Sequence, residues 1–114
     1  MVLPGKESHG ALADEVAKLT CEALQQNVPK DVAGIAFLSG GQSDYDATNH
    51  LNRINQLAEK SPWPITFSFG RALLADALSL WAKSKTEAAQ TKLLKRSAEN
   101  TRASVGSWEK GPDQ

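Results

Sequence analysis

The fold of this chain is decided by two similar stretches, Gly34-Ile35-Ala36-Phe37-Leu38-Ser39-Gly40-Gly41-Gln42-Ser43 and Trp63-Pro64-Ile65-Thr66-Phe67-Ser68-Phe69-Gly70-Arg71-Ala72-Leu73. In each, a short apolar run ends in small residues and leads directly into a segment with helical periodicity. This order is typical of a strand, a tight turn and a helix, and ligands bind at the carboxyl ends of such parallel strands. The two stretches therefore predict two parallel strands whose turns share one ligand site.

The expected fold class is α/β, with strands over residues 33–38 and 65–69 and helices over about 11–26, 44–57, 72–82 and 86–103. The first strand has no polar alternation, so we expect it to be covered on both faces, as in a parallel sheet. A two-stranded sheet buries little surface on its own. The sequence therefore resembles a slice of a larger α/β protein, and we treat residues 1–114 as a single partial domain.

Apolar spacing also predicts which side of each helix packs inward. The expected inward residues are Leu12, Val16, Leu19, Ala23 and Leu24 in the first helix, Leu73, Leu74, Ala77, Leu78 and Trp81 in the third, and Ala89, Leu93 and Arg96 in the last. Ser43 is the expected N-cap of the second helix, and Ser84 with Glu87 has the spacing of a capping box before the last.

Composition argues against several classes of protein. The 114 residues carry 13 basic and 13 acidic side chains, so no excess of positive charge is present to bind a nucleic-acid backbone. No apolar run approaches the length that spans a membrane, and the N-terminus lacks the pattern of a signal peptide. We expect a cytoplasmic protein with no membrane or nucleic-acid partner.

The single cysteine and the two histidines give no sign of a metal or a cofactor. Cys21 cannot form an internal disulfide, and its place in a predicted helix favours a packed residue over a reactive thiol. His9 and His50 lie far apart without a carboxylate or cysteine at metal-ligand spacing, so both are expected at the surface.

The residues at the two strand ends suit an oxyanion. Ser39, Gly40 and Gly41 allow the backbone to approach an anion closely, and the following helix adds its positive N-terminus. Ser68, Gly70 and Arg71 repeat the arrangement with a guanidinium, which can bind two phosphate oxygens at once. Composition alone supports a structural interpretation equally well. In that interpretation, the glycines only form tight turns and Arg71 is a solvated residue at a helix start. No Ser/His/Asp set accompanies either serine, so nucleophilic catalysis has little support.

The run Leu38-Ser39-Gly40-Gly41-Gln42 is also similar to the signature of ATP-binding-cassette ATPases. Those proteins need a Gly-x-x-x-x-Gly-Lys-Ser/Thr loop for the nucleotide phosphates, and this sequence has none. The residues that follow Gln42 are acidic, whereas that family is usually basic there. We therefore disfavour nucleotide binding.

The two turns together resemble class I fructose-bisphosphate aldolase much more closely. The resemblance rests on 32–43 and 67–73 and, outside these motifs, on Met1-Val2-Leu3-Pro4-Gly5-Lys6-Glu7, Ala47-Thr48, Leu51-Asn52, Ile54-Asn55, Leu78, Trp81 and Ala103-Ser104-Val105-Gly106. It covers nearly the whole chain in order. It implies the last part of a (β/α)8 TIM barrel, with strands seven and eight and their flanking helices. A whole barrel needs about 250 residues, so this chain is incomplete as a barrel.

The resemblance also implies a function and a set of site residues. The family reversibly cleaves fructose 1,6-bisphosphate to dihydroxyacetone phosphate and glyceraldehyde 3-phosphate in glycolysis, through a Schiff base on a lysine and without a metal or other cofactor. That lysine is expected upstream of Met1, so we assign no catalytic residue here and expect the isolated chain to be inactive. The resemblance places Ser39, Gly40, Gly41, Ser68, Gly70 and Arg71 around the substrate phosphate, and it implies a homo-oligomer, a tetramer.

A second hypothesis stays open at this point. The chain would then be a non-catalytic module, derived from an aldolase, that binds phosphate or another protein. Such a module would have to cover its exposed strand edges by self-association.

Overall fold

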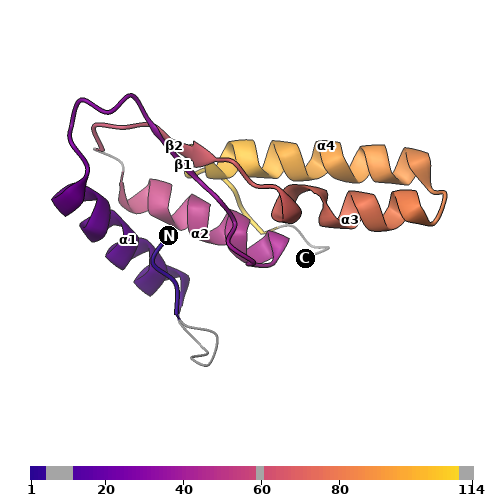
Figure 1. Ribbon diagram of the computed structural model, residues 1–114, viewed down its shortest axis with the longest axis horizontal. Helices are drawn as coiled ribbons and strands as arrows, with labels where there is room; N and C mark the ends of the chain where they lie inside the picture. Colours follow the sequence, from indigo (N-terminus) through magenta and orange to yellow (C-terminus); the bar gives the residue numbers. More distant parts are fainter. Residues whose placement is uncertain (5–11, 59–60, 111–114) are drawn as a thin grey trace.

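The structure, a computed structural model, describes residues 1–4, 12–58 and 61–110. Its elements follow in the order α1 (Ala13–Asn27), β1 (Ile35–Phe37), α2 (Asp44–Leu57), β2 (Ile65–Phe67), α3 (Arg71–Ala82) and α4 (Thr86–Ala103) (Figure 1). The predicted helices and strands are all present, although each strand is only three residues long. The start of the first predicted helix at residue 11 lies outside the described residues.

The two strands pair in parallel, which confirms the α/β fold class. Ile35 lies opposite Ile65, and Phe37 lies opposite Phe67. Beyond the paired residues, the Ser68 amide donates to the Phe37 carbonyl at 2.7 Å. The carboxyl ends of both strands therefore lie side by side, and the two turns begin at the same edge of the sheet.

Only one face of this sheet is covered, contrary to the prediction from the apolar run. Phe37, Ile65 and Phe69 are buried in a core to which all four helices contribute. The alternate residues point the other way and are exposed, and Leu38 retains 73% of its accessible surface. The prediction of a doubly covered strand was wrong for this chain because its helices pack against one face only.

Helix α2 lies at the centre of the core. Its residues Leu51 and Ile54 are fully buried, and the helix packs against α1, α3, α4 and β2. α1 packs on α2 through a buried stripe that includes Val16, Thr20 and Cys21. The predicted inward residues Leu12 and Leu19 are exposed. The buried side of α1 includes the polar residue Thr20. Its hydroxyl accepts a hydrogen bond from the Val2 amide at 2.8 Å, so Thr20 can be buried with its polar group paired.

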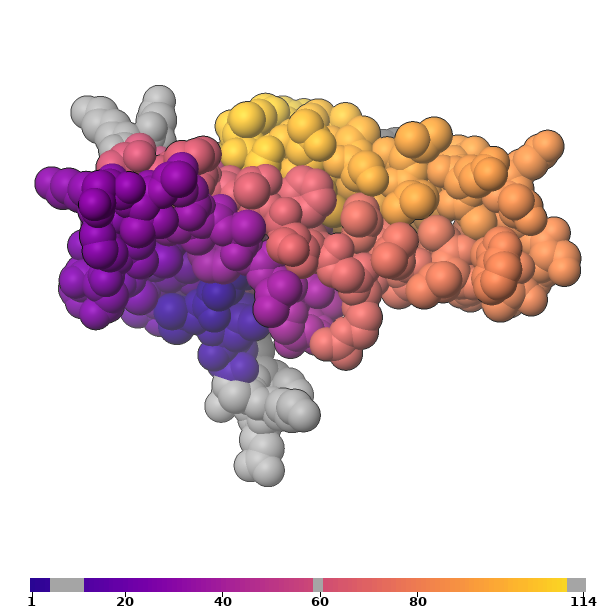
Figure 2. All heavy atoms as spheres, turned by 45° about the horizontal axis from the view of Figure 1, so that its top comes forward, coloured from indigo at the N-terminus to yellow at the C-terminus, as the bar shows by residue number. Residues whose placement is uncertain are grey.

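Helices α3 and α4 form a hairpin that extends away from the strands (Figures 1 and 2). Ala77 and Ala89 are buried in the contact between them. The predicted inward residues Leu74, Leu78 and Trp81 are exposed, Trp81 to 64%. They remain exposed because the hairpin extends beyond the sheet, so α3 has α4 as its main neighbour. The prediction for α4 was correct at Ala89 and Arg96, which are buried; Leu93 is only half-buried.

The two predicted helix caps had different outcomes. Ser43 is the N-cap of α2, and its Oγ accepts a hydrogen bond from the Asp46 amide at 3.1 Å, as expected. The capping box at Ser84 was wrong, because α4 begins one residue later with Lys85 as its N-cap and no side-chain cap bond. Ser84 instead has φ +62°, in the tight turn that reverses the chain between α3 and α4.

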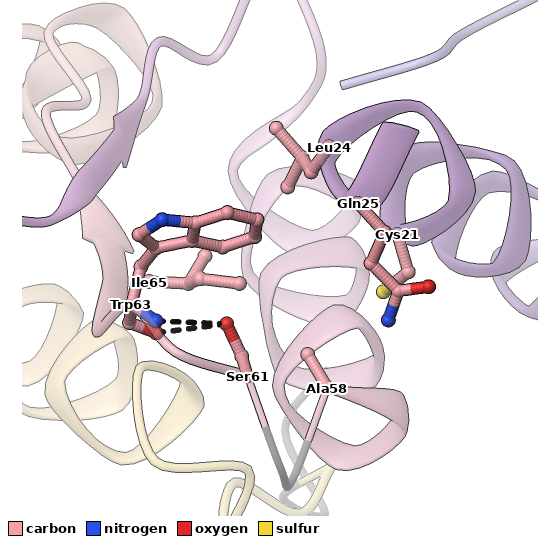
Figure 3. A pocket seen from close by; sticks show the side chains of 7 residues that line it. All are labelled: Cys21, Leu24, Gln25, Ala58, Ser61, Trp63 and Ile65. Atoms are coloured by element: carbon pink, nitrogen blue, oxygen red, sulfur yellow. Dashed lines mark hydrogen bonds between the residues drawn. The ribbon is translucent and has the colours of Figure 1, made fainter. Parts of the chain in front are cut away.

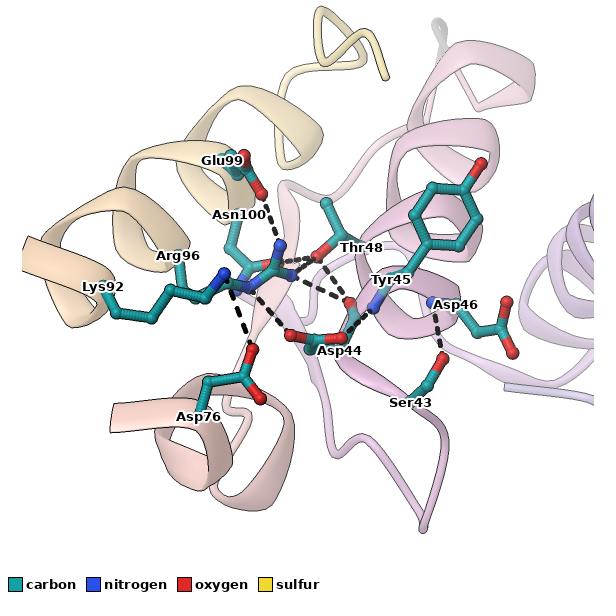
Figure 4. Close-up of polar contacts among 10 residues, drawn as sticks. All are labelled: Ser43, Asp44, Tyr45, Asp46, Thr48, Asp76, Lys92, Arg96, Glu99 and Asn100. Carbon is teal, nitrogen blue, oxygen red and sulfur yellow. Dashed lines mark hydrogen bonds and ion pairs between the residues drawn. The ribbon is translucent and has the colours of Figure 1, made fainter. Parts of the chain in front are cut away.

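A buried arginine joins α4 to the first turn of α2 (Figure 4). Arg96 is 2% exposed; its Nη2 donates to the Asp44 carbonyl at 2.9 Å and to Thr48 Oγ1, and its Nη1 donates to Glu99. Arg96 Nε lies 3.7 Å from Asp44 Oδ2. Thr48 Oγ1 also donates to Asn100 Oδ1 at 2.6 Å. Charged and polar groups buried in this way are stable only while they are paired.

Replacement of Arg96 by leucine is expected to lower the free energy of unfolding by about 3–5 kcal/mol, because it breaks the buried network in which the guanidinium binds Glu99, Thr48 and the Asp44 carbonyl. Equilibrium unfolding in urea measures this loss. The matched control is Arg53→Leu, which removes an exposed pair with Asp14 and should cost no more than about 1 kcal/mol. Equal losses in the two variants would contradict a structural role for Arg96.

Candidate functional site

The first turn, residues 39–42, is held in a conformation that requires glycine. Gly40 has φ +61° and Gly41 has φ +85°, both in the left-handed region that side chains disfavour. The Gln42 amide donates to the Ser39 carbonyl at 3.2 Å and closes the turn. Gly40 and Gly41 are exposed, whereas Ser39 is only 5% exposed. The open surface of this turn is therefore backbone, and the Ser39 side chain lies beneath it.

The N-terminus of α2 is less open to an anion than the sequence suggested. The Asp46 amide donates to Ser43 Oγ, and the Tyr45 amide donates to Asp44 Oδ1 at 2.7 Å. Two of the first-turn N–H groups are thus already bound by the helix's own side chains. The carboxylates of Asp44 and Asp46 also offset the positive end of the helix dipole.

The N-terminus of α3 has the opposite character. Gly70 is its N-cap and makes no side-chain cap hydrogen bond, and the first turn of α3 has no acidic residue. Arg71 is the first residue of the helix and is exposed, as is Ser68. A helix start without a capping side chain, together with a guanidinium, forms a site of positive potential. This end of the sheet is therefore more suitable for an anion than the N-terminus of α2.

The structure brings the two turns together. A methyl group placed on Gly41 would lie 3.9 Å from Arg71 Nη2, so the guanidinium reaches the glycine turn. The hydrogen bond from Ser68 to Phe37 fixes the second strand end beside the first. Of the six residues predicted around an anion, Gly40, Gly41, Ser68, Gly70 and Arg71 are exposed at this edge, and Ser39 is buried just below it.

His50 and Gln42 are part of this region, which the sequence did not indicate. His50 was expected at the surface, but it is half-buried and its Nδ1 lies 2.5 Å from Gln42 Oε1. The Gln42 side chain in turn donates from Nε2 to the Ser39 carbonyl at 2.6 Å. The only available signal was the position of Gln42 just before α2 and of His50 eight residues later in the helix, and polar residues often have such a spacing by chance. His9 lies outside the described residues.

Cys21 is a packing residue, as predicted, and lies away from the strand ends. It lines a small pocket between α1 and the segment that leads into β2, together with Trp63 and Ser61 (Figure 3). Its Sγ lies 3.7 Å from the Ile54 carbonyl, and burial raises the pKa of the Cys21 thiol. A thiol in this state is a poor nucleophile.

Within the described ranges, no group of three or more His, Cys, Asp or Glu side chains is placed to hold a metal ion. Over the same residues, no helix has the length and apolar character needed to cross a membrane.

Comparison with known proteins identifies the family. The sequence profile of class-I fructose-bisphosphate aldolases, of the glycolytic family, matches residues 1–114. The chain is 52% identical to the fructose-bisphosphate aldolase of Schistosoma mansoni, over 83% of this chain and 27% of that protein. It is 44% identical to a cytoplasmic isozyme from Cicer arietinum, over 100% of this chain and 32% of that protein.

A solved structure supports the same family assignment. Fructose-bisphosphate aldolase from Plasmodium falciparum, determined in complex with TRAP and a small molecule inhibitor, superposes with a TM-score of 0.85 and 39% identity, over 91% of this chain and 30% of that one. A partial α/β unit with this arrangement thus occurs in a protein of the TIM-barrel class. This chain belongs to the class I fructose-bisphosphate aldolase family, and it spans about a third or less of the length of the relatives it matches.

Acidification is expected to weaken the fold through His50. Burial lowers the pKa of His50, and the Asp46 carboxylate opposes part of this shift. The unfolded state, with a histidine pKa of about 6.5, therefore binds the proton more readily. The stabilisation is complete above about pH 6.5 and is lost as the pH falls toward the folded pKa, with a slope of at most about 1.4 kcal/mol per pH unit.

Denaturant unfolding of the wild type and of His50→Asn is compared between about pH 5 and 7.5. The difference between the two pH profiles isolates the contribution of His50 to stability, because all other groups titrate in both proteins. The wild type should lose stability more steeply on acidification than the variant does. Parallel pH profiles would show that His50 titrates alike in the folded and unfolded chains.

Proposed function

We propose that this chain is the C-terminal part of an aldolase barrel, with β1 and β2 as its seventh and eighth strands and residues 1–114 as one partial domain. The observation that carries the proposal is the meeting of Gly41 with Arg71 at the carboxyl edge of a parallel pair. The carboxyl edge is where TIM-barrel enzymes place their active sites, often with a phosphate site after strands seven and eight.

In this proposal the two turns bind one phosphate group of the substrate. The exposed backbone N–H groups of Gly40 and Gly41 approach it from one side, and those at the start of α3, with Ser68 and Gly70, approach from the other. Arg71 supplies the positive charge and two parallel donors. Ser39 supports the turn from beneath, since its carbonyl accepts two hydrogen bonds from Gln42.

The reaction of the whole protein follows from its family. It is the reversible cleavage of fructose 1,6-bisphosphate to dihydroxyacetone phosphate and glyceraldehyde 3-phosphate in glycolysis. A phosphate held at the strand ends positions the ketone for a lysine nucleophile, which would form the Schiff base. By the family resemblance that lysine has no counterpart in residues 1–114, so this chain contributes substrate binding and not covalent chemistry.

The same family membership supports a homo-oligomer, with a tetramer as the expected form, and a cytoplasmic location. Its relative from Cicer arietinum is named as a cytoplasmic isozyme. The exposed sheet face at Ala36, Leu38 and Thr66 is apolar enough to require further protein over it, which fits a unit that is part of a larger barrel.

Replacement of Arg71 by alanine is expected to weaken the binding of fructose 1,6-bisphosphate by about 1.5–3 kcal/mol, the usual value of a hydrogen bond to a charged group. Isothermal titration of the protein with this sugar phosphate measures the loss. Arg102→Ala removes an exposed arginine from α4 and serves as the control of equal charge. Unchanged affinity in Arg71→Ala, or equal losses in both variants, would refute the role of Arg71.

The isolated 114-residue chain is expected to bind the sugar phosphate without turnover. Borohydride reduction in the presence of fructose 1,6-bisphosphate would trap any Schiff base, and the intact mass of the chain should remain unchanged. A chain that gains the mass of the reduced substrate would show that one of its own lysines acts as the nucleophile, and the assignment of chemistry to other parts of the protein would then be wrong.

A further inference from the structure

The side chain of Gln42 connects the glycine turn to the middle of α2. Its Nε2 donates to the Ser39 carbonyl at 2.6 Å and lies 3.6 Å from Met1 Sδ, and its Oε1 lies 2.5 Å from His50 Nδ1. The Ser39 carbonyl also accepts the backbone amide of Gln42. One side chain thus contacts the turn, the N-terminal segment and a helix position eight residues further along.

The chemistry of these contacts fixes the orientation of every group. A carbonyl oxygen can only accept, so the Gln42 atom beside Ser39 must be the amide nitrogen. The atom that faces His50 is therefore the amide oxygen, which also can only accept. His50 Nδ1 must then carry a hydrogen and donate it. The imidazole holds Gln42 in the one orientation in which its Nε2 can donate to the turn.

The turn needs such support because of its composition. Gly40 and Gly41 both adopt positive φ values and have no side chains that could anchor them. Glycine loses more conformational freedom on ordering than any other residue. Without the side-chain bond from Gln42, the two glycines would be held mainly by the 3.2 Å backbone hydrogen bond between Gln42 and Ser39.

We propose that Gln42 and His50 are positioning residues: His50 orients the Gln42 amide, and that amide orders the Gly40–Gly41 turn so that its N–H groups face the anion site beside Arg71. This inference rests on the phosphate-binding role proposed above for that turn. Neither residue touches the anion itself. Both act through the Ser39 carbonyl, which lies on the buried side of the turn.

The order of the turn is measured directly by ¹H–¹⁵N heteronuclear NOE values of the Gly40 and Gly41 amides in the full chain. His50→Leu removes the donor, and Gln42→Glu replaces the amide nitrogen that bonds Ser39 with an oxygen. Both variants should lower the NOE values at the two glycines. His50→Asn should retain them, because the asparagine Nδ2 occupies the position of the histidine Nδ1 and donates in the same direction.

Asn49→Leu is the matched control, a half-buried neighbour of His50 on the same helix. It should leave the glycine NOE values unchanged. If His50→Leu fails to fold, Gln42→Glu carries the test, since Gln42 is only half-buried and glutamate has nearly the same shape. Wild-type NOE values in both His50→Leu and Gln42→Glu, or an equal loss in His50→Asn, would overturn the positioning role.

Titration with sulfate, whose charge does not change near neutral pH, connects the ordered turn to anion binding. In the wild type, sulfate should shift the Gly40 and Gly41 amide resonances. His50→Leu should weaken this binding by about two- to tenfold, the usual effect of one neutral hydrogen bond, and His50→Asn should restore it. If wild-type resonances do not shift, the phosphate-binding role fails, and the NOE comparison alone decides whether Gln42 and His50 order the turn.

Discussion

The contact between Arg96 and the first turn of α2 is the interaction on which the rest of the structure depends. Asp44, whose carbonyl accepts from the guanidinium, is the first residue of α2 and follows the glycine turn by two residues. α4, which carries Arg96, also packs along α3, which begins with Arg71. One buried side chain therefore fixes both halves of the candidate site relative to each other. It can do so because Glu99, Thr48 and Asp44 compensate for the loss of water around its charge.

The two strand ends look alike in sequence, but they differ in how their backbone donors are used. In α2, Ser43 and Asp44 bind N–H groups of the first turn, and the acidic residues there reduce the positive potential. In α3, no side chain caps the start, and Arg71 adds charge. An anion at this edge would thus be bound mainly by glycine N–H groups from one turn and by the helix start and guanidinium of the other. This difference between the two strand ends follows from local hydrogen bonding, because an N–H group that is already bound contributes little to the binding of a ligand.

Much of the fold was predictable because it depends on local pattern. The elements, the Ser43 cap and the extent of α4 follow from periodicity and capping residues close in sequence. Apart from the capping box at Ser84, the errors concern burial. Leu74, Leu78 and Trp81 have the spacing of a core-facing stripe but are exposed, since apolar spacing shows which side of a helix is apolar and not whether another element covers it. The prediction that both faces of β1 are covered was wrong for the same reason. The sequence proposed the six candidate residues at the turns, which the structure brings to one edge of the sheet. It did not indicate His50 and Gln42, because their contact joins a turn to a helix through polar side chains that have no distinctive pattern.

The sequence by itself determined the strand–turn–helix order, the need for glycine at residues 40 and 41, and the membership of the aldolase family, because these depend on backbone conformation and on motifs read along the chain. Only the tertiary structure decided that Arg71 reaches Gly41, that Arg96 is buried against α2, and that His50 orients Gln42. These contacts join residues that are 8 to 52 positions apart. Such pairs form only when packing has fixed the distance and direction between whole elements, and no local preference encodes that geometry.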